Sequence, residues 1–104
     1  MTTAHLLVIY PPPKDTNAFE RAYREEHLPY AGPRLKGATG VVSKRVAAPD
    51  GKAPYYAISD VTFPSMAALQ TCAASAGGRE ALAHAASIST GGAPLILVTT
   101  DDLA

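Results

Sequence analysis

Residues 5–13 read HLLVIYPPP, an apolar run that stops at three consecutive prolines. Residues 5–10 combine β-branched and other apolar side chains, which is typical of a strand. The prolines end this strand because proline has no N–H to donate to a sheet ladder. The strand that opens the chain is therefore apolar on both of its faces.

A helix is predicted for residues 16–28. Apolar or aromatic side chains recur there at a spacing of three and four: Phe19, Ala22, Tyr23 and His27. That spacing places them on one helix face. Asp15 is the expected N-cap, with Asn17 as the alternative because Glu20 would complete a capping box with it. Pro29 removes a backbone donor, so we expect the helix to end or kink there.

Proline and glycine bound the remaining segments. They are strands at 41–47, 55–63 and 93–100, a helix that Ser65 can cap, and a second helical stretch at 79–87 after an interruption at Gly77 and Gly78. The order is β-α-β-β-α-β, the split β-α-β arrangement of ferredoxin-like folds. The sequence therefore predicts one α+β domain over residues 1–104, with the helices on one face of an antiparallel sheet.

The first and last strands do not alternate between apolar and polar residues. Residues 6–9 and 95–98 are apolar throughout, yet helices can cover only one face of the sheet. A second copy of the sheet, related by a two-fold axis, is the simplest cover for the other face. The alternative is that these runs mark central strands with imperfect alternation. We favour the homodimer.

Composition excludes several classes of function. Nine Lys and Arg balance nine Asp and Glu, so no excess of cations is available to bind nucleic acid. The apolar runs are far shorter than the ~20 residues of a transmembrane helix. The N-terminus has no targeting pattern, which predicts a cytoplasmic protein without membrane association. A lone cysteine, Cys72, allows no internal disulfide. No metal-ligand spacing or phosphate-binding glycine loop is present, so we expect no metal and no cofactor.

The segment YREEHLP at residues 23–29 resembles the signature of the EthD family, in the dimeric α/β-barrel superfamily. Residues 7–11, 48–56 and 91–92 agree with the family pattern. The resemblance implies a barrel formed by two ferredoxin-like sheets, and a pocket between sheet and helices in each copy. It also implies a link to ether degradation beside an oxidising system, whereas superfamily relatives act as isomerases, decarboxylases, cyclases and cofactor-free monooxygenases. His84 departs from the pattern, because an acidic or amide residue is more usual there.

His27 is the leading candidate for chemistry. It follows Tyr23 by one turn on the inner helix face, and an imidazole there can act as a general acid or base. The alternative is a core histidine bonded to a carbonyl. Asp60 shares a strand face with Tyr56 and Thr62 by period-two alternation. If that face lines the pocket, Asp60 orients His27 or accepts a proton itself.

Two alternatives for Asp60 are solvation and pairing with Arg45. Phenols that could bind a substrate oxygen are Tyr10, Tyr23, Tyr30 and Tyr56, of which the first two and Tyr56 are our candidate substrate-binding residues. Packing is the simpler explanation for each.

The leading functional hypothesis is an EthD-like protein that acts on a small, largely apolar organic compound by acid–base chemistry. Isomerase, lyase, cyclase and monooxygenase reactions all fit this hypothesis. An accessory role in oxidative degradation, beside an oxidoreductase, also fits. The alternatives are a non-catalytic carrier of a hydrophobic metabolite and a structural dimer without a ligand.

Overall fold

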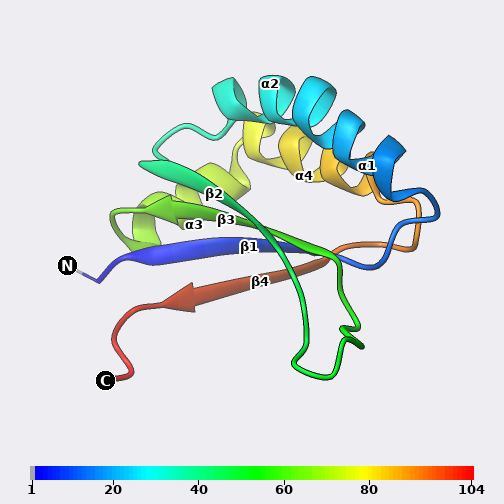
Figure 1. The fold of residues 1–104 in the computed structure, drawn as a ribbon. Coiled ribbons are helices and arrows are strands. Elements are labelled where there is room, and N and C mark those ends of the chain that lie inside the picture. Colours follow the sequence, from blue (N-terminus) through cyan, green and yellow to red (C-terminus); the bar gives the residue numbers. More distant parts are fainter. Residues whose placement is uncertain (1) are drawn as a thin grey trace.

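The computed structural model describes residues 2–104 and contains a four-stranded antiparallel sheet with every helix on one side (Figure 1). The strands are β1 (Ala4–Tyr10), β2 (Gly40–Arg45), β3 (Ala57–Phe63) and β4 (Leu95–Thr100). Their order across the sheet is β2-β3-β1-β4. The predicted ferredoxin-like α+β fold is therefore confirmed. The predicted strands ran up to two residues too far into the loops.

The helical layer has two parts. Its first part runs without a break through α1 (Thr16–Ala22), the π-helical turn η1 (Tyr23–His27), α2 (Leu28–Ala31) and the 3₁₀ turn η2 (Gly32–Arg34). Its second part consists of α3 (Met66–Ala74) and α4 (Ala76–Ile88). Asp15 caps α1, since its carboxylate accepts from the Ala18 N–H at 3.0 Å. None of the helices in residues 2–104 is long and apolar enough to cross a membrane.

Of the two outcomes expected at Pro29, an end or a kink, the helix does not end: it continues past the proline after an irregular turn. Within η1 the N–H of Leu28 reaches back five residues to the carbonyl of Tyr23. This wider turn comes just before the proline, and Pro29 then occupies the first turn of α2. Such π-turns are frequent at functional sites. Here the turn carries both Tyr23 and His27.

The break between the last two helices lies at Ser75 and not at the glycines. Ser75 ends α3 and caps α4, where its hydroxyl accepts from the Gly78 N–H at 3.0 Å. A β-carbon on Gly78 would come within 1.9 Å of the Cys72 carbonyl oxygen. The glycine therefore permits a close approach between two helices and does not interrupt one.

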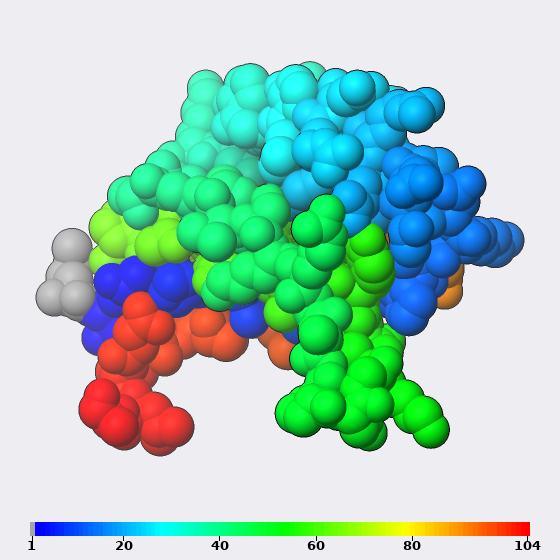
Figure 2. Space-filling view, in the orientation of Figure 1, coloured from blue at the N-terminus to red at the C-terminus, as the bar shows by residue number. Residues whose placement is uncertain are grey.

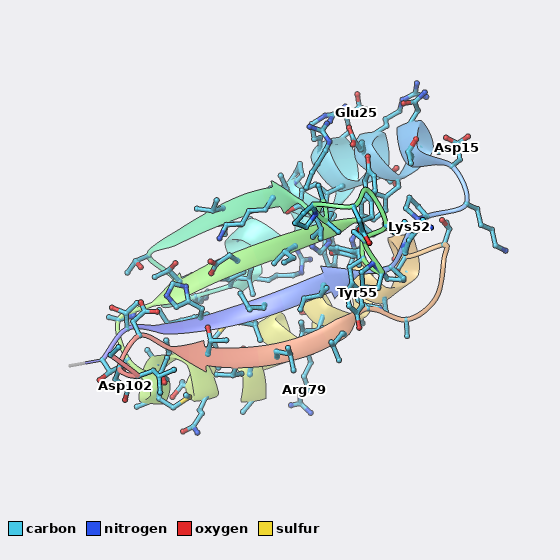
Figure 3. The ribbon with its side chains drawn as sticks, turned by 60° about the horizontal axis from the view of Figure 1, so that its bottom comes forward. Asp15, Glu25, Lys52, Tyr55, Arg79 and Asp102 are labelled. Atoms are coloured by element: carbon cyan, nitrogen blue, oxygen red, sulfur yellow. The ribbon has the colours of Figure 1, made fainter. Side chains whose placement is uncertain are left out.

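The core lies between the sheet and the helices, in two adjoining clusters. The buried members are Ala4, Leu6, Val61, Phe63, Leu69 and Cys72 in one, and Val8, Tyr10, Phe19, Tyr23, Ala85 and Ile88 in the other. Burial raises the pKa of the Cys72 thiol above its usual value. Within residues 2–104 the opposite face of the sheet carries no helix, and the strands cross it uncovered (Figure 3).

Candidate functional site

A cavity of about 230 Å³ lies between the sheet and the helices. Strands β1 and β3 form its floor, and α2 and α4 form its walls, with apolar side chains such as Leu6, Val61 and Leu82. Among residues 2–104, the only polar side chains in its lining are His27 and Ser59. The cavity therefore suits a small apolar molecule that carries one or two polar groups.

His27 reaches this cavity from the π-turn and is 5% exposed. Its Nδ1 lies 3.0 Å from Nδ1 of His84, which belongs to α4, and the two rings are nearly parallel at 9°. One of these nitrogens must carry a hydrogen and the other must accept it. The two imidazoles therefore form a hydrogen-bonded pair, and His27 is tied to a side chain rather than to a carbonyl.

The environment of His27 favours its neutral form. Burial, followed by repulsion from His84, lowers the pKa of His27 to about 4. A group with this pKa is unprotonated at neutral pH and can accept a proton.

His84 links this buried imidazole to the surface. It is partly exposed, and its ring stacks on Tyr30 with ring centres 4.5 Å apart. The guanidinium of Arg34 covers the Tyr30 ring at 3.6 Å. His27, His84, Tyr30 and Arg34 therefore form a continuous stack from the cavity to the outside of the helical layer. Tyr30 supports His84, and no hydrogen bond of its hydroxyl is present within residues 2–104.

The Tyr23 hydroxyl contacts two serine hydroxyls on the helix-covered face of the sheet. Its hydroxyl lies 2.5 Å from the Ser59 hydroxyl on β3 and 2.6 Å from the Ser43 hydroxyl on β2. Ser59 lines the cavity that holds His27. Tyr23 therefore does not line that cavity itself and can act on a ligand there only through Ser59.

Tyr10 is fully buried, with its ring edge against Phe19 at 5.0 Å. Its hydroxyl has no hydrogen-bond partner in residues 2–104, and burial raises its pKa above the usual value. Tyr10 is absent from the walls of the cavity, so the structure assigns it a place in the core beside the site.

Tyr56 lies at a second hollow, of about 300 Å³, between α1 and the edge of the sheet. Its hydroxyl donates to the Glu20 carboxylate, which also accepts from Arg45 Nε at 2.8 Å and Nη2 at 2.7 Å. The hydrogen bond from Arg45, and then that from Tyr56, lowers the pKa of Glu20 to about 2. Tyr56 is therefore held by an ion pair. Leu28 lines both this hollow and the cavity of His27.

Asp60 does not meet His27, and the expectation that its strand face lines the pocket was wrong. Asp60 pairs with Leu7 and Val42 in the sheet register, so its side chain points away from the helices, opposite to its neighbour Ser59. Tyr56 precedes β3 and turns to the helix side, so these two residues do not share a face. The suggested pairing of Asp60 with Arg45 was also wrong.

The partners of Asp60 lie on the bare face. Its carboxylate contacts His5 Nδ1 at 2.7 Å and Lys44 Nζ at 3.4 Å. His5 Nε2 lies 2.8 Å from the Asp101 carboxylate. Hydrogen bonds to Asp101 and then to Asp60 raise the pKa of His5. The bare face therefore carries a cluster in which His5 lies between two carboxylates.

Two residues of the site, Ser59 and His84, were not predicted as site residues, although His84 was noted as a departure from the EthD pattern. Ser59 alternates with Val61 and Phe63 on the inner face of β3, so period two could have placed it beside the pocket. His84 precedes the buried Ala85 and lies one turn after the buried Ala81, a spacing that could have placed it at the edge of the inner face of α4. Only the contact between α4 and η1 pairs it with His27. Within residues 2–104 no group of three or more His, Cys, Asp or Glu side chains could hold a metal ion.

The fold and the cavity define a ferredoxin-like α+β protein with a pocket between sheet and helices. No family model and no curated protein matches the sequence. Its structure is similar to that of an EthD (ethyl tert-butyl ether) family protein from Bacillus halodurans C-125, with a TM-score of 0.83, 20% identity and coverage of 95% of this chain and 97% of that one.

Two further solved structures share the fold. An EthD-like protein from Ralstonia eutropha JMP134 has a TM-score of 0.70 and 19% identity, over 95% of this chain and 91% of that one. A dimeric ferredoxin-like protein of unknown function from Jannaschia sp. CCS1 has a TM-score of 0.63 and 19% identity, over 95% of this chain and 98% of that one. At these identities the likeness shows the fold.

Proposed function

We propose that this chain is an EthD-like protein that binds a small, largely apolar organic compound and moves a proton on it, with His27 as the base and without a bound cofactor. The observation that carries the proposal is the 3.0 Å contact between His27 and His84 at the wall of a cavity of about 230 Å³. An unprotonated imidazole beside an otherwise apolar ligand site is suited to general base catalysis.

The histidine pair gives each imidazole a role. When His27 donates its Nδ1 hydrogen to His84, Nε2 of His27 is left free to take a proton from a ligand. The positive charge that results is shared with His84, which is partly exposed and can release a proton to water. This arrangement supports proton removal next to a carbonyl or a phenol. Isomerisation, decarboxylation, cyclisation and oxygen addition to an activated substrate all contain such a step.

The uncovered face of the sheet supports a homodimer. Leu95 is 40% exposed there and Leu97 44%, and they pair with Ile9 and Leu7 of β1. Val42, 53% exposed, lies on the far side of Asp60 on the edge strand β2. A contiguous apolar surface of this kind marks an interaction site. Figure 2 shows the β2–β3 loop and the C-terminal residues projecting below the sheet, with a recess between them. A second copy packed into that recess would complete the barrel implied by the EthD resemblance.

A carrier function is the alternative, because the cavity lining is apolar except at His27 and Ser59. The resemblance of residues 23–29 to the EthD signature also implies an accessory role in oxidative degradation of the bound compound. A carrier would bind the ligand with no change to it. The two functions are therefore separated by a measurement of proton transfer on a bound molecule.

The test uses phenylacetone, a small apolar ketone with exchangeable hydrogens next to its carbonyl. NMR in D₂O would follow loss of those hydrogens with wild type, His27→Gln and His84→Asn. We expect wild type to accelerate exchange, His27→Gln to lose at least 100-fold, in line with the usual contribution of a general base, and His84→Asn to lose less. His5→Asn, on the other face of the sheet, is the matched control and should exchange at the wild-type rate.

Binding of phenylacetone without accelerated exchange would reject the base and leave the carrier. Equal exchange by wild type and His27→Gln would also reject His27 as the base. Circular dichroism of each variant would check that it is folded.

A further inference from the structure

Three hydroxyl groups form a hydrogen-bonded chain on the helix-covered face of the sheet. Ser59 and Ser43 both contact the Tyr23 hydroxyl, at 2.5 and 2.6 Å. The Ser59 end belongs to the cavity of His27, whereas the Ser43 end belongs to the second hollow. The chain is therefore a polar connection between two separate spaces in the molecule.

The number of protons in this chain is fixed. Three hydroxyls carry three hydrogens, and the two hydrogen bonds between them use two. When the bonds run from Ser59 toward Ser43, the unused hydrogen lies on Ser43. When they run in the opposite direction, it lies on Ser59. The chain thus always has one unused donor, and reversing the bonds moves this donor from one end to the other.

Burial decides which direction holds without a ligand. Ser59 is 4% exposed, whereas Ser43 is exposed on the edge strand. A hydroxyl hydrogen left unpaired at a buried position is unfavourable, so the unused donor belongs at Ser43, where water can accept it. An acceptor atom placed in the His27 cavity would reverse the chain, because Ser59 would then have a partner for its hydrogen.

We infer that the Ser59–Tyr23–Ser43 chain is a reversible hydrogen-bond donor that makes the His27 cavity selective for apolar molecules carrying one uncharged acceptor oxygen, such as a ketone, an ether or a phenol. The apolar walls accept the body of such a ligand, and Ser59 binds its oxygen. This inference rests on the proposed function only in taking the same cavity as a ligand site. It requires no proton transfer by His27.

The test compares two probes of nearly identical shape, acetophenone and α-methylstyrene, which differ in a carbonyl oxygen against a methylene group. Dissociation constants would be measured by NMR titration. Ser59→Ala should raise the dissociation constant of acetophenone about fivefold, which corresponds to about 1 kcal/mol for one hydrogen bond. The dissociation constant of α-methylstyrene should change less than twofold. Ser43→Ala should change the dissociation constant of acetophenone less than twofold, because Ser59 and Tyr23 still share one unused donor that Ser59 can direct at the ligand.

Ser87→Ala is the matched control, since the Ser87 hydroxyl donates to the His84 carbonyl on the exposed side of α4 and should affect neither probe. Equal weakening of both probes by Ser59→Ala would overturn the inference, because it would show a packing role. Equal weakening of acetophenone by Ser59→Ala and Ser43→Ala would overturn reversal of the chain. Failure of wild type to prefer acetophenone, or to bind either probe, would overturn selectivity.

His27→Gln separates this inference from the proposed function. That variant should lose proton exchange while keeping the fivefold effect of Ser59→Ala on acetophenone. Loss of exchange with intact selectivity upholds both proposals. Intact exchange in His27→Gln would reject only the catalytic one.

Discussion

A histidine lies on each side of the sheet, and the pKa values of the two shift in opposite directions. On the helix-covered face, His27 is buried against another imidazole and its pKa falls to about 4. On the bare face, His5 lies between two carboxylates, those of Asp60 and Asp101, and its pKa rises. The two residues belong to one small fold, and their environments account for the difference.

The two histidines are suited to different roles. A neutral imidazole beside a cavity can take a proton from a ligand, whereas an imidazole held between carboxylates favours the charged form and contributes an ion-pair network. The covered face therefore carries the proposed reactive site. The bare face, with its apolar strands and its histidine cluster at one end, carries the proposed interface.

The largest expected effect comes from a charge placed on the bare face. Leu97→Asp on β4 would bury two unpaired carboxylates at the interface of a dimer, one from each copy. We expect the dimer dissociation constant to rise at least 1000-fold, about 4 kcal/mol, measured by analytical ultracentrifugation or light scattering. The covered face should be unaffected, so acetophenone binding should persist if the cavity is complete in one chain.

The control for this prediction is Ala83→Asp, which places the same charge on the exposed side of α4. It should leave the mass in solution at twice that of the chain. A wild-type protein that is monomeric at micromolar concentration would remove the functional contrast between the two faces.

The second prediction concerns acid stability and depends on His27. Its pKa of about 4 in the folded protein lies below the 6.5 of the unfolded chain, so unfolding takes up a proton between these values. The free energy of unfolding should therefore fall by about 3 kcal/mol as pH drops from 7 to 4, and His27→Gln should remove this loss. Urea unfolding at several pH values and fixed protein concentration would measure it. An unchanged acid slope in His27→Gln would contradict the buried neutral imidazole.

The smallest effect is expected at His5, with the opposite sign. Its pKa in the folded protein is raised, so its stabilising contribution is fully present below pH 6.5 and is lost as pH rises through the higher folded value. His5→Asn should make the melting temperature less sensitive to pH above neutrality. The same urea or thermal series would show this, and a slope identical to wild type would mean that the carboxylate contacts of His5 do not persist in solution.

Much of the fold was predictable because its signals are local. The proline run at residues 11–13, the cap at Asp15 and the three-and-four spacing around Phe19 each depend on a few neighbouring residues. The errors occurred where a local rule had an exception. Pro29 was expected to end or kink a helix, and the helix continues past it after a π-turn. Gly78 was expected to break a helix, but it is a contact point between two.

The site was predictable in part for a related reason. His27 could be placed on an inner helix face by periodicity, and the structure puts it at a cavity. Asp60 could be placed on one face of its strand, but not on the correct one. A period of two shows which residues share a face, whereas only the packing of the helices decides which face is covered.

The order of strands and helices, and the residues that share a face of each element, follow from local sequence, since periodicity and capping act over a few residues. Three contacts follow only from the packing of the elements: His84 with His27 across 57 positions, Tyr23 with both Ser43 and Ser59, and Asp60 with His5 on the other face. Contacts between distant segments depend on how whole elements pack, and no short window of sequence contains that information.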